Sequence, residues 1–292
     1  MGKLIIHADD FGLTKQVNEG IIQAHTKGIV TSASIMANGS SFEHAVELYR
    51  LSPTLDIGIH LNLIEELPIL EKDRIKSLVD EDGKLHRDQR IFVKKYLRRK
   101  ICLKEVEDEL EMQIQKVMDS GIKPSHIDSH QHLHMLPGIL SVTLKLMKRY
   151  DILAVRLPCE TIRFKTIMSS VSISRVIQLM ILNFLSLKVK RLSLLGADHF
   201  SGFLYSGKIN HRNLEALLDN LPQDGVCELM CHPGLENEQS DYHHWGYRWS
   251  DELNALTDPS LAYLIWQKGF ELVSYQDLLD HKSDLTQISS IT

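Results

Sequence analysis

Short apolar runs alternate along the chain with stretches in which apolar residues recur at helical spacing. The apolar runs predict strands at residues 3–8, 32–36, 56–61, 125–129, 154–156, 226–230 and 270–273. The helical stretches between them lie at residues 15–27, 42–50, 104–120, 138–150, 210–219 and 259–268. Repeated strand-helix units indicate a parallel sheet, so we expect an α/β fold, a distorted (β/α) barrel of the TIM type.

An open, doubly wound sheet is the alternative, and the polar residues argue against it. In a barrel the chemistry collects at the carboxyl ends of many strands, whereas an open sheet gathers ligands at one switch point. Candidate residues fall at or just beyond the ends of five predicted strands. They are Asp9, Asp10, His60, His130, Arg156 and His232. We therefore expect a single barrel domain over residues 1–292.

Two segments interrupt the alternation. Residues 65–100 are polar and charged, which predicts an insertion over the rim with a basic helical patch at 92–99. Residues 160–195 are apolar and basic, with no acidic residue between Thr161 and Ala197. A membrane-surface helix has such a composition, but we favour a lid or oligomer-contact helix whose apolar face is buried by protein. Arg175, Gln178 and Asn183 interrupt the apolar run, so no membrane span is expected.

The composition narrows the class of protein. The chain has 292 residues, of which 43% are hydrophobic, as in a globular protein with a sizeable core. Its net charge of -5 gives no electrostatic signal for nucleic acid. The first residues begin a strand at once and carry no pattern of an export signal, so we expect a cytoplasmic protein. The four cysteines are scattered, which predicts free thiols.

Adjacent carboxylates at a strand end are the first chemical signal. Asp9 and Asp10 repel each other unless a cation or a proton is shared between them. Histidine-bearing clusters follow later strands, at residues 58–62, 126–134 and 228–234. Two imidazoles and one carboxylate leave open positions on a divalent ion, and a water bound there supplies hydroxide near neutral pH. Because neighbouring strand residues point to opposite sides, one aspartate can bind metal while the other accepts a proton from the water or orients a ligand.

Residues 7–13, 58–63, 126–134 and 230–233 together resemble the YdjC-like carbohydrate deacetylases, the family that includes chitooligosaccharide deacetylase. The resemblance implies a barrel related to the polysaccharide deacetylases, in a cytoplasmic homodimer. It also implies a divalent metal ion, usually described as Mg²⁺, although the ligand set suits Zn²⁺ as well. Carried over by position, the metal ligands are Asp10, His60 and His130, and the catalytic base is Asp9.

Further residues receive roles as expectations. His232, at the end of a different strand, is the candidate acid that protonates the departing amine. Arg156 steadies Asp9 or the charge of the intermediate. For His126 we expect a role behind the metal ligands or in substrate binding.

Three aromatic side chains complete the set of candidates. His132 and His134 either line a sugar cleft or hydrogen-bond the backbone. Trp245 lies in the aromatic-rich segment 241–249, which is either a saccharide platform or a cap over the rim.

The sequence thus predicts a hydrolase acting on linear amide C–N bonds. Its substrate is an N-acetylated amino sugar or a short oligosaccharide of the N-acetylglucosamine or chitooligosaccharide kind, and its products are acetate and a free amine. The alternatives are a metal-dependent phosphoesterase or another amidohydrolase on the same barrel, and a non-catalytic sugar-binding module.

Overall fold

A computed structural model describes residues 1–161, 172–192, 194–236 and 241–280. The strands are β1 (Gly2–Phe11), β2 (Ser32–Ile35), β3 (Asp56–Leu61), β4 (His126–Ser129), β5 (Ala154–Val155), β6 (His199–Ser201), β7 (Val226–Cys231) and β8 (Phe270–Leu272). The α-helices are α1 (Lys15–Thr26), α2 (Phe42–Leu51), α3 (Gln89–Leu97), α4 (Leu103–Asp119), α5 (Pro137–Arg149), α7 (Ile173–Val189), α8 (His211–Leu218), α9 (Trp249–Leu256) and α10 (Ser260–Gln267). Short 3₁₀ helices are η1 (Lys72–Arg74), η2 (His130–Met135), η3 (Lys190–Leu192) and η4 (His243–Trp245).

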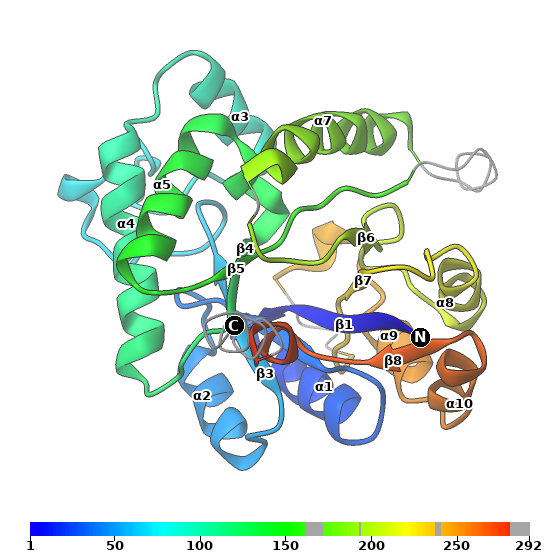
Figure 1. Cartoon of the computed structure of the whole chain (residues 1–292). Coiled ribbons are helices and arrows are strands. Elements are labelled where there is room, and N and C mark those ends of the chain that lie inside the picture. Colours follow the sequence, from blue (N-terminus) through cyan, green and yellow to red (C-terminus); the bar gives the residue numbers. More distant parts are fainter. Residues whose placement is uncertain (162–171, 193, 237–240, 281–292) are drawn as a thin grey trace, which may run out of the picture.

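The strands pair in parallel in the order β5-β4-β3-β2-β1-β7-β6, with β8 added beside β1 (Figure 1). Strand β8 pairs with the first residues of β1, and β2 pairs with its later residues. Between the outer strands β5 and β6, the described residues form only isolated bridges, Ala154 with Leu195 and Glu160 with Phe200. The expected α/β barrel-type fold is confirmed, and its distortion lies at this weak closure.

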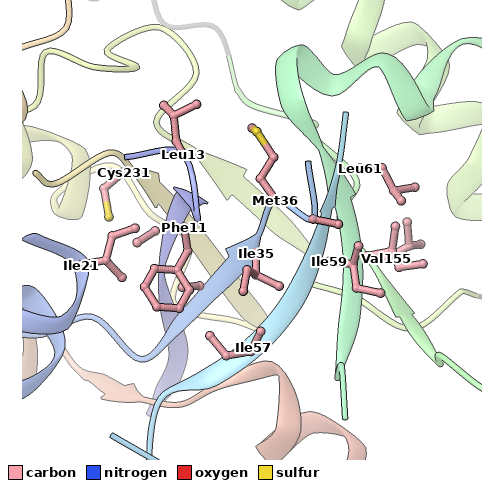
Figure 2. Packing of buried hydrophobic residues seen from close by; sticks show 14 of the residues in the cluster. Phe11, Leu13, Ile21, Ile35, Met36, Ile57, Ile59, Leu61, Val155 and Cys231 are labelled. Carbon is pink, nitrogen blue, oxygen red and sulfur yellow. The ribbon is translucent and has the colours of Figure 1, made fainter. Parts of the chain in front are cut away.

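Alternation along β1 separates two environments. Leu4, Ile6 and Ala8 belong to the large core between sheet and helices, where Phe11 and Ile21 also pack (Figure 2). The residues between them in β1 point to the other face of the curved sheet, toward the interior of the barrel. Ile5 lies there in a small apolar cluster with Ala154, Val273, Tyr275 and Leu278. His7 and Asp9 follow on the same side, so the interior becomes polar toward the carboxyl ends of the strands.

Helices and strands agree with the sequence-based prediction except in three places. The short strand β6 and the helix α9 were not predicted. The basic helix predicted at 92–99 is α3, which begins earlier, after the N-cap Asp88. The apolar segment 160–195, for which a lid or contact helix was predicted, contains α7, and its residues 162–171 lie outside the described residues. None of the helices in the described residues is long and apolar enough to cross a membrane.

Candidate metal centre and active site

Strand β1 ends in a break of its regular geometry at Asp10. The backbone φ of Asp10 is 67°, and the register against β2 shifts between Ala8 and Phe11. A left-handed, non-glycine residue costs roughly 1–3 kcal/mol and is typical of functional sites. Because of this break, the side chains of Asp9 and Asp10 do not simply alternate between the two faces of the strand, contrary to what we expected. Both carboxylates, 3% and 1% exposed, are therefore buried at the same rim.

Asp10, His60 and His130 come together from three separate strand ends. Their candidate ligand atoms all lie within 4.8 Å of one another. The Oδ1 atom of Asp10 is 3.3 Å from Nε2 of His60 and 3.0 Å from Nδ1 of His130. The structure thus juxtaposes the three residues named as metal ligands.

The donor atoms of this cluster fit a divalent cation. Within the described chain, Oδ2 of Asp10 and Nε2 of His60 are buried and have no hydrogen-bond partner. A buried polar atom left unpaired costs about 1–3 kcal/mol, so natural proteins rarely keep one without a use. One carboxylate and two imidazoles form a set that binds zinc and related divalent ions and leaves positions for water and substrate.

The orientation of His60 is fixed from behind. Its Nδ1 lies 2.7 Å from Oδ1 of Asp128, and the Ser34 hydroxyl donates to the other oxygen of Asp128 at 3.0 Å. An imidazole that donates from Nδ1 to a carboxylate presents the lone pair of Nε2 toward a metal. Asp128 belongs to the histidine-rich motif, but its supporting role is visible only in the structure.

Nearby carboxylates raise the pKa values of the two candidate histidine ligands, so the cluster stabilises positive charge. Burial alone would lower the pKa of His60, but Asp128 and Asp10 raise it to about 10. Burial likewise opposes protonation of His130, yet Asp10 and Glu65 raise its pKa to about 9. A metal must replace these protons, so metal affinity rises with pH.

Asp9 is held in place by a fully buried arginine. Nη2 of Arg156 donates to Oδ1 of Asp9 at 2.7 Å, and Nη1 donates to Oδ2 at 2.8 Å. The same guanidinium contacts Glu228 at 2.8 Å and Asp128 at 2.7 Å. Burial alone would raise the pKa of Asp9, but Arg156 and His7 lower it well below the usual range. Asp9 is therefore ionised and held through both of its oxygens by Arg156, which contacts Asp9, one of the two partners that the sequence analysis left open for it.

His232 follows β7, which pairs with β1 on the side away from β3 and β4. It lines a small cavity together with Asp9, His60 and His130. Its Nδ1 is buried and unpartnered among the described residues, while its backbone N–H donates to Glu252 at 2.5 Å. Burial lowers the pKa of His232, so its ring is neutral near pH 7 before substrate binds.

The other histidines of the motif occupy different positions. His126 is fully buried beneath the site, where its Nε2 lies 2.7 Å from that of His7 and its ring stacks on Tyr275 at 3.9 Å. It is not among the residues that line the cavities at the rim. His134 bonds the Ser129 hydroxyl and a backbone carbonyl, the second of the two roles left open for it.

Besides His130, His132 is the histidine of this run that borders a cavity. It lines the small cavity beside Asp9 and also a larger neighbouring one. Its φ of 55° turns the chain sharply after β4, and its Nδ1 has no partner among the described residues. This placement suits contact with substrate.

Glu65 is a site residue that sequence reasoning missed. Its Oε2 lies 3.4 Å from Nε2 of His130, and its Oε1 accepts from the Trp245 indole at 3.2 Å. The Trp245 ring lies 5.0 Å from that of His130. The insertion after β3 therefore reaches the metal cluster, although an acidic pair at the start of a polar loop gave no distinctive signal.

Two larger cavities flank the site. One is polar, about 940 Å³ in volume, and includes Lys15, Glu65 and His244 in its lining. The other lies between α3 and α7, has a volume of about 600 Å³, and is lined mainly by aliphatic and basic side chains. Trp245 borders the second cavity and contacts Glu65 of the first. The site thus has two chemically different cavities beside it: one shares His132 and Tyr247 with the small cavity, and the other is lined by Glu65, which contacts His130.

Comparisons with known proteins agree with this geometry. The family described as YdjC-like protein matches residues 3–267. A carbohydrate deacetylase of Brevibacillus brevis is 32% identical over 277 residues, covering 94% of this chain and 99% of that protein. A carbohydrate deacetylase of Enterococcus faecalis is 34% identical over 287 residues, covering 94% and 98%. A solved structure from Enterococcus faecalis V583, described in terms of cellobiose-phosphate cleavage, superimposes with a TM-score of 0.75 at 32% identity and covers 95% of this chain and 98% of that one.

Proposed function

Because the chain belongs to the YdjC-like family, we propose that it is a metal-dependent carbohydrate deacetylase. It hydrolyses the N-acetyl group of an amino sugar or short oligosaccharide and releases acetate and a free amine. The observation that carries the proposal is the buried cluster of Asp10, His60 and His130 with its unpaired donor atoms. The enzyme is a hydrolase acting on amide C–N bonds, an assignment supported by relatives that are named carbohydrate deacetylase.

Asp9 acts as the base in this proposal. A divalent ion held by Asp10, His60 and His130 would lower the pKa of a water and polarise the acetyl carbonyl. Asp9 accepts the proton of the attacking water, because its carboxylate lines the same cavity and stays ionised. Arg156 keeps both oxygens of Asp9 in one orientation, which is the role of a positioning residue.

His232 provides the proton that the departing amine needs. Its ring lines the cavity from β7, and its buried Nδ1 has no protein partner among the described residues. Burial disfavours the protonated ring, whereas the charges of Asp9 and Asp10 favour it. Burial outweighs these charges in the free site, so His232 takes up a proton from solvent as negative charge develops on the tetrahedral intermediate and then passes it to the departing amine.

The saccharide lies in the polar cavity lined by Glu65, whose Oε1 accepts from the Trp245 indole of the neighbouring cavity. Sugar hydroxyls need hydrogen-bonding partners, and the lining supplies Lys15, Gln16 and Glu66. His132 faces the reacting group from the other side. His126 and His134 support the strand ends from within the protein and make no part of this substrate contact.

The finer assignments are also proposals. The metal is Mg²⁺ by family resemblance, with Zn²⁺ as the alternative that the two imidazoles favour. The chain acts as one barrel domain in a cytoplasmic homodimer. Elemental analysis of the untreated protein identifies the ion, and analytical ultracentrifugation gives the oligomeric state.

The direct test is product analysis. Acetate release from N-acetylglucosamine oligomers is measured beside phosphate release from a panel of phosphoesters, with each divalent ion supplied in turn. Release of acetate alone is expected. Phosphate release would favour a phosphoesterase, and saccharide binding without turnover under any ion would favour a sugar-binding module.

A further inference from the structure

Helix α7 packs against the rim with one side only. Leu179, Ser186 and Val189 are buried on that side. The opposite side carries a continuous stripe of large apolar side chains, each more than half exposed within the described structure. They are Ile173, Ile177, Met180, Ile181, Phe184 and Leu187. A soluble surface rarely exposes such a stripe unless it contacts a partner or a lipid. The expected burial of this face by protein is not provided by the described part of the chain.

The surroundings of this stripe are basic. No acidic residue occurs between Thr161 and Ala197, and residues 89–104, which contain α3, have none either. Lys188 lies over the Phe184 ring at 4.3 Å, and Arg90 and Lys94 are exposed on α3. The whole chain has a net charge of -5, so these cations are concentrated on one face against the overall balance. A partner for this face must be both apolar and anionic.

The cavity between α3 and α7 has the same apolar and basic character as the exposed surface. Its aliphatic lining includes Val93, Leu136 and Leu182, and Arg90, Lys94, Arg98 and Arg175 also line it. Ile181 and Leu97 line the cavity and are exposed, so its apolar wall runs out onto the α7 stripe. The cavity shares His132, Arg175 and Tyr247 with the small cavity at the metal cluster (Figure 1 shows α3 and α7 above β4 and β5). One extended ligand can therefore reach from this surface to the reacting centre.

Two other occupants match these features less well. A bare saccharide needs partners for its hydroxyls, and the polar cavity on the other side of the site already supplies them. A second copy in a two-fold contact would bring the same basic surface against itself, without acidic side chains from α3 or α7 to offset the repulsion. An anionic lipid surface supplies apolar chains and negative headgroups together.

We propose that α3 and the exposed stripe of α7 dock on an anionic lipid surface. Resting on the proposed deacetylase function, the substrate is then an amino sugar carried by a lipid, whose apolar part enters the cavity between α3 and α7. The sugar lies on the polar side of the site, so that the acetyl group meets the metal cluster between the two cavities.

Flotation of the whole protein with vesicles tests the docking. Vesicles of mixed phosphatidylcholine and phosphatidylglycerol are compared with phosphatidylcholine alone, at low and high salt. We expect binding to the anionic vesicles at low salt and a loss of roughly tenfold or more in Phe184→Glu and in the double variant Lys94→Glu/Arg98→Glu. Leu51→Glu, which adds the same charge at a residue 81% exposed on α2, is the control and keeps binding.

Absence of binding to anionic vesicles at low salt overturns the docking, as does equal binding by Phe184→Glu. Conversion of a wild-type dimer to a monomer by Phe184→Glu in ultracentrifugation also overturns it, because the stripe is then a subunit contact. The substrate class is tested by acetate release: kcat/KM for dodecyl N-acetylglucosaminide should exceed that for the methyl glycoside by roughly tenfold or more. Equal values contradict it.

Failure of this inference is separable from failure of the proposed function. Acetate release from diacetylchitobiose without vesicle binding leaves the deacetylase proposal intact and removes the docking. Vesicle binding without acetate release from any sugar removes the lipid-linked substrate along with the deacetylase.

Discussion

At the scale of single residues, the site depends on two neighbouring aspartates that have different surroundings. Asp10 adopts a left-handed backbone and faces His60 and His130, while Asp9 is clamped by Arg156. The two carboxylates differ in their partners, because Asp10 contacts the candidate ligands His60 and His130 whereas Asp9 contacts Arg156 and His7. The sequence predicted both positions and a division of roles, but it could not predict the backbone break that brings both carboxylates to one rim.

Asp9→Asn tests the role of the base. Asparagine keeps the shape of the side chain and can still accept one of the two hydrogen bonds from Arg156 through its remaining oxygen, but it cannot take a proton from water. We expect unchanged metal content and a fall in kcat of about 100-fold or more. Acetate release and elemental analysis on the same preparation decide it, and an unaltered rate would refute this role for Asp9.

Glu252 gives a prediction about pH and stability. It is fully buried and accepts from the backbone N–H groups of Ile209 and His232. Burial raises its pKa from 4.5 to about 8. The folded state therefore keeps a proton that the unfolded state loses, and this stabilisation is complete below about pH 4.5 and disappears as pH rises to about 8.

Glu252→Gln should therefore flatten the decline in the free energy of unfolding between about pH 5 and 8. Urea denaturation across this range measures the slope, which is independent of any constant offset from the lost hydrogen bond. Glu215→Gln, an exposed carboxylate change on α8, is the control and should leave the slope as in wild type. Parallel slopes for Glu252→Gln and wild type would show that Glu252 is ionised throughout.

At the scale of elements, the strand ends were the predictable part of the site. Apolar runs ending in polar residues located Asp10, His60, His130 and His232, because parallel strands bring their carboxyl ends to one rim. The insertions were not predictable in detail. Glu65 reaches His130 only through a loop conformation with a φ of 68°, and hydrophobic periodicity carries no information about such a loop.

Gly58 in β3 shows how closely the strands are packed around the buried histidines. A Cβ at this position would lie 2.3 Å from Nε2 of His126, whose ring is wedged against Tyr275. Gly58→Ala should therefore lower the free energy of unfolding by about 1–3 kcal/mol or more. Urea denaturation of the variant and the wild type measures this difference in the free energy of unfolding.

Gly138→Ala in α5 is the matched control, since the added Cβ meets only the side chain of Leu103, which is 41% exposed and can move. This variant should be neutral or slightly stabilising, because alanine favours a helix over glycine. A Gly58→Ala variant that is as stable as Gly138→Ala would mean that the His126 ring moves aside easily and does not constrain β3.

At the scale of the whole molecule, the barrel-type sheet assembles a centre to which distant segments contribute. β1, β3, the turn after β4, β5 and β7 each place a residue at the rim, and residues 275–280 add Tyr275 from below. The family, the fold class and the strand order along the chain followed from motifs and periodicity. The weak closure between β5 and β6 did not, because β6 has only three residues and no clear apolar pattern.

Metal binding should stabilise the whole fold. The folded state assembles Asp10, His60 and His130, whereas the unfolded chain does not, so a divalent ion at 100 times its Kd should add about 2.7 kcal/mol to the free energy of unfolding. Thermal unfolding is compared after chelation and after return of the ion. The rise in Tm is expected in wild type and should be absent in His60→Ala, and an equal rise in both would place the ion elsewhere.

Metal content per chain tests the central claim most directly. Purified wild-type protein and its His60→Ala and His130→Ala variants are dialysed against the same limiting divalent ion and analysed for bound metal. Stoichiometric metal in wild type and its loss in both variants, with folding shown by circular dichroism, is the result that this account predicts. A wild-type protein that binds no metal, or folded variants that bind as much as wild type, would contradict it.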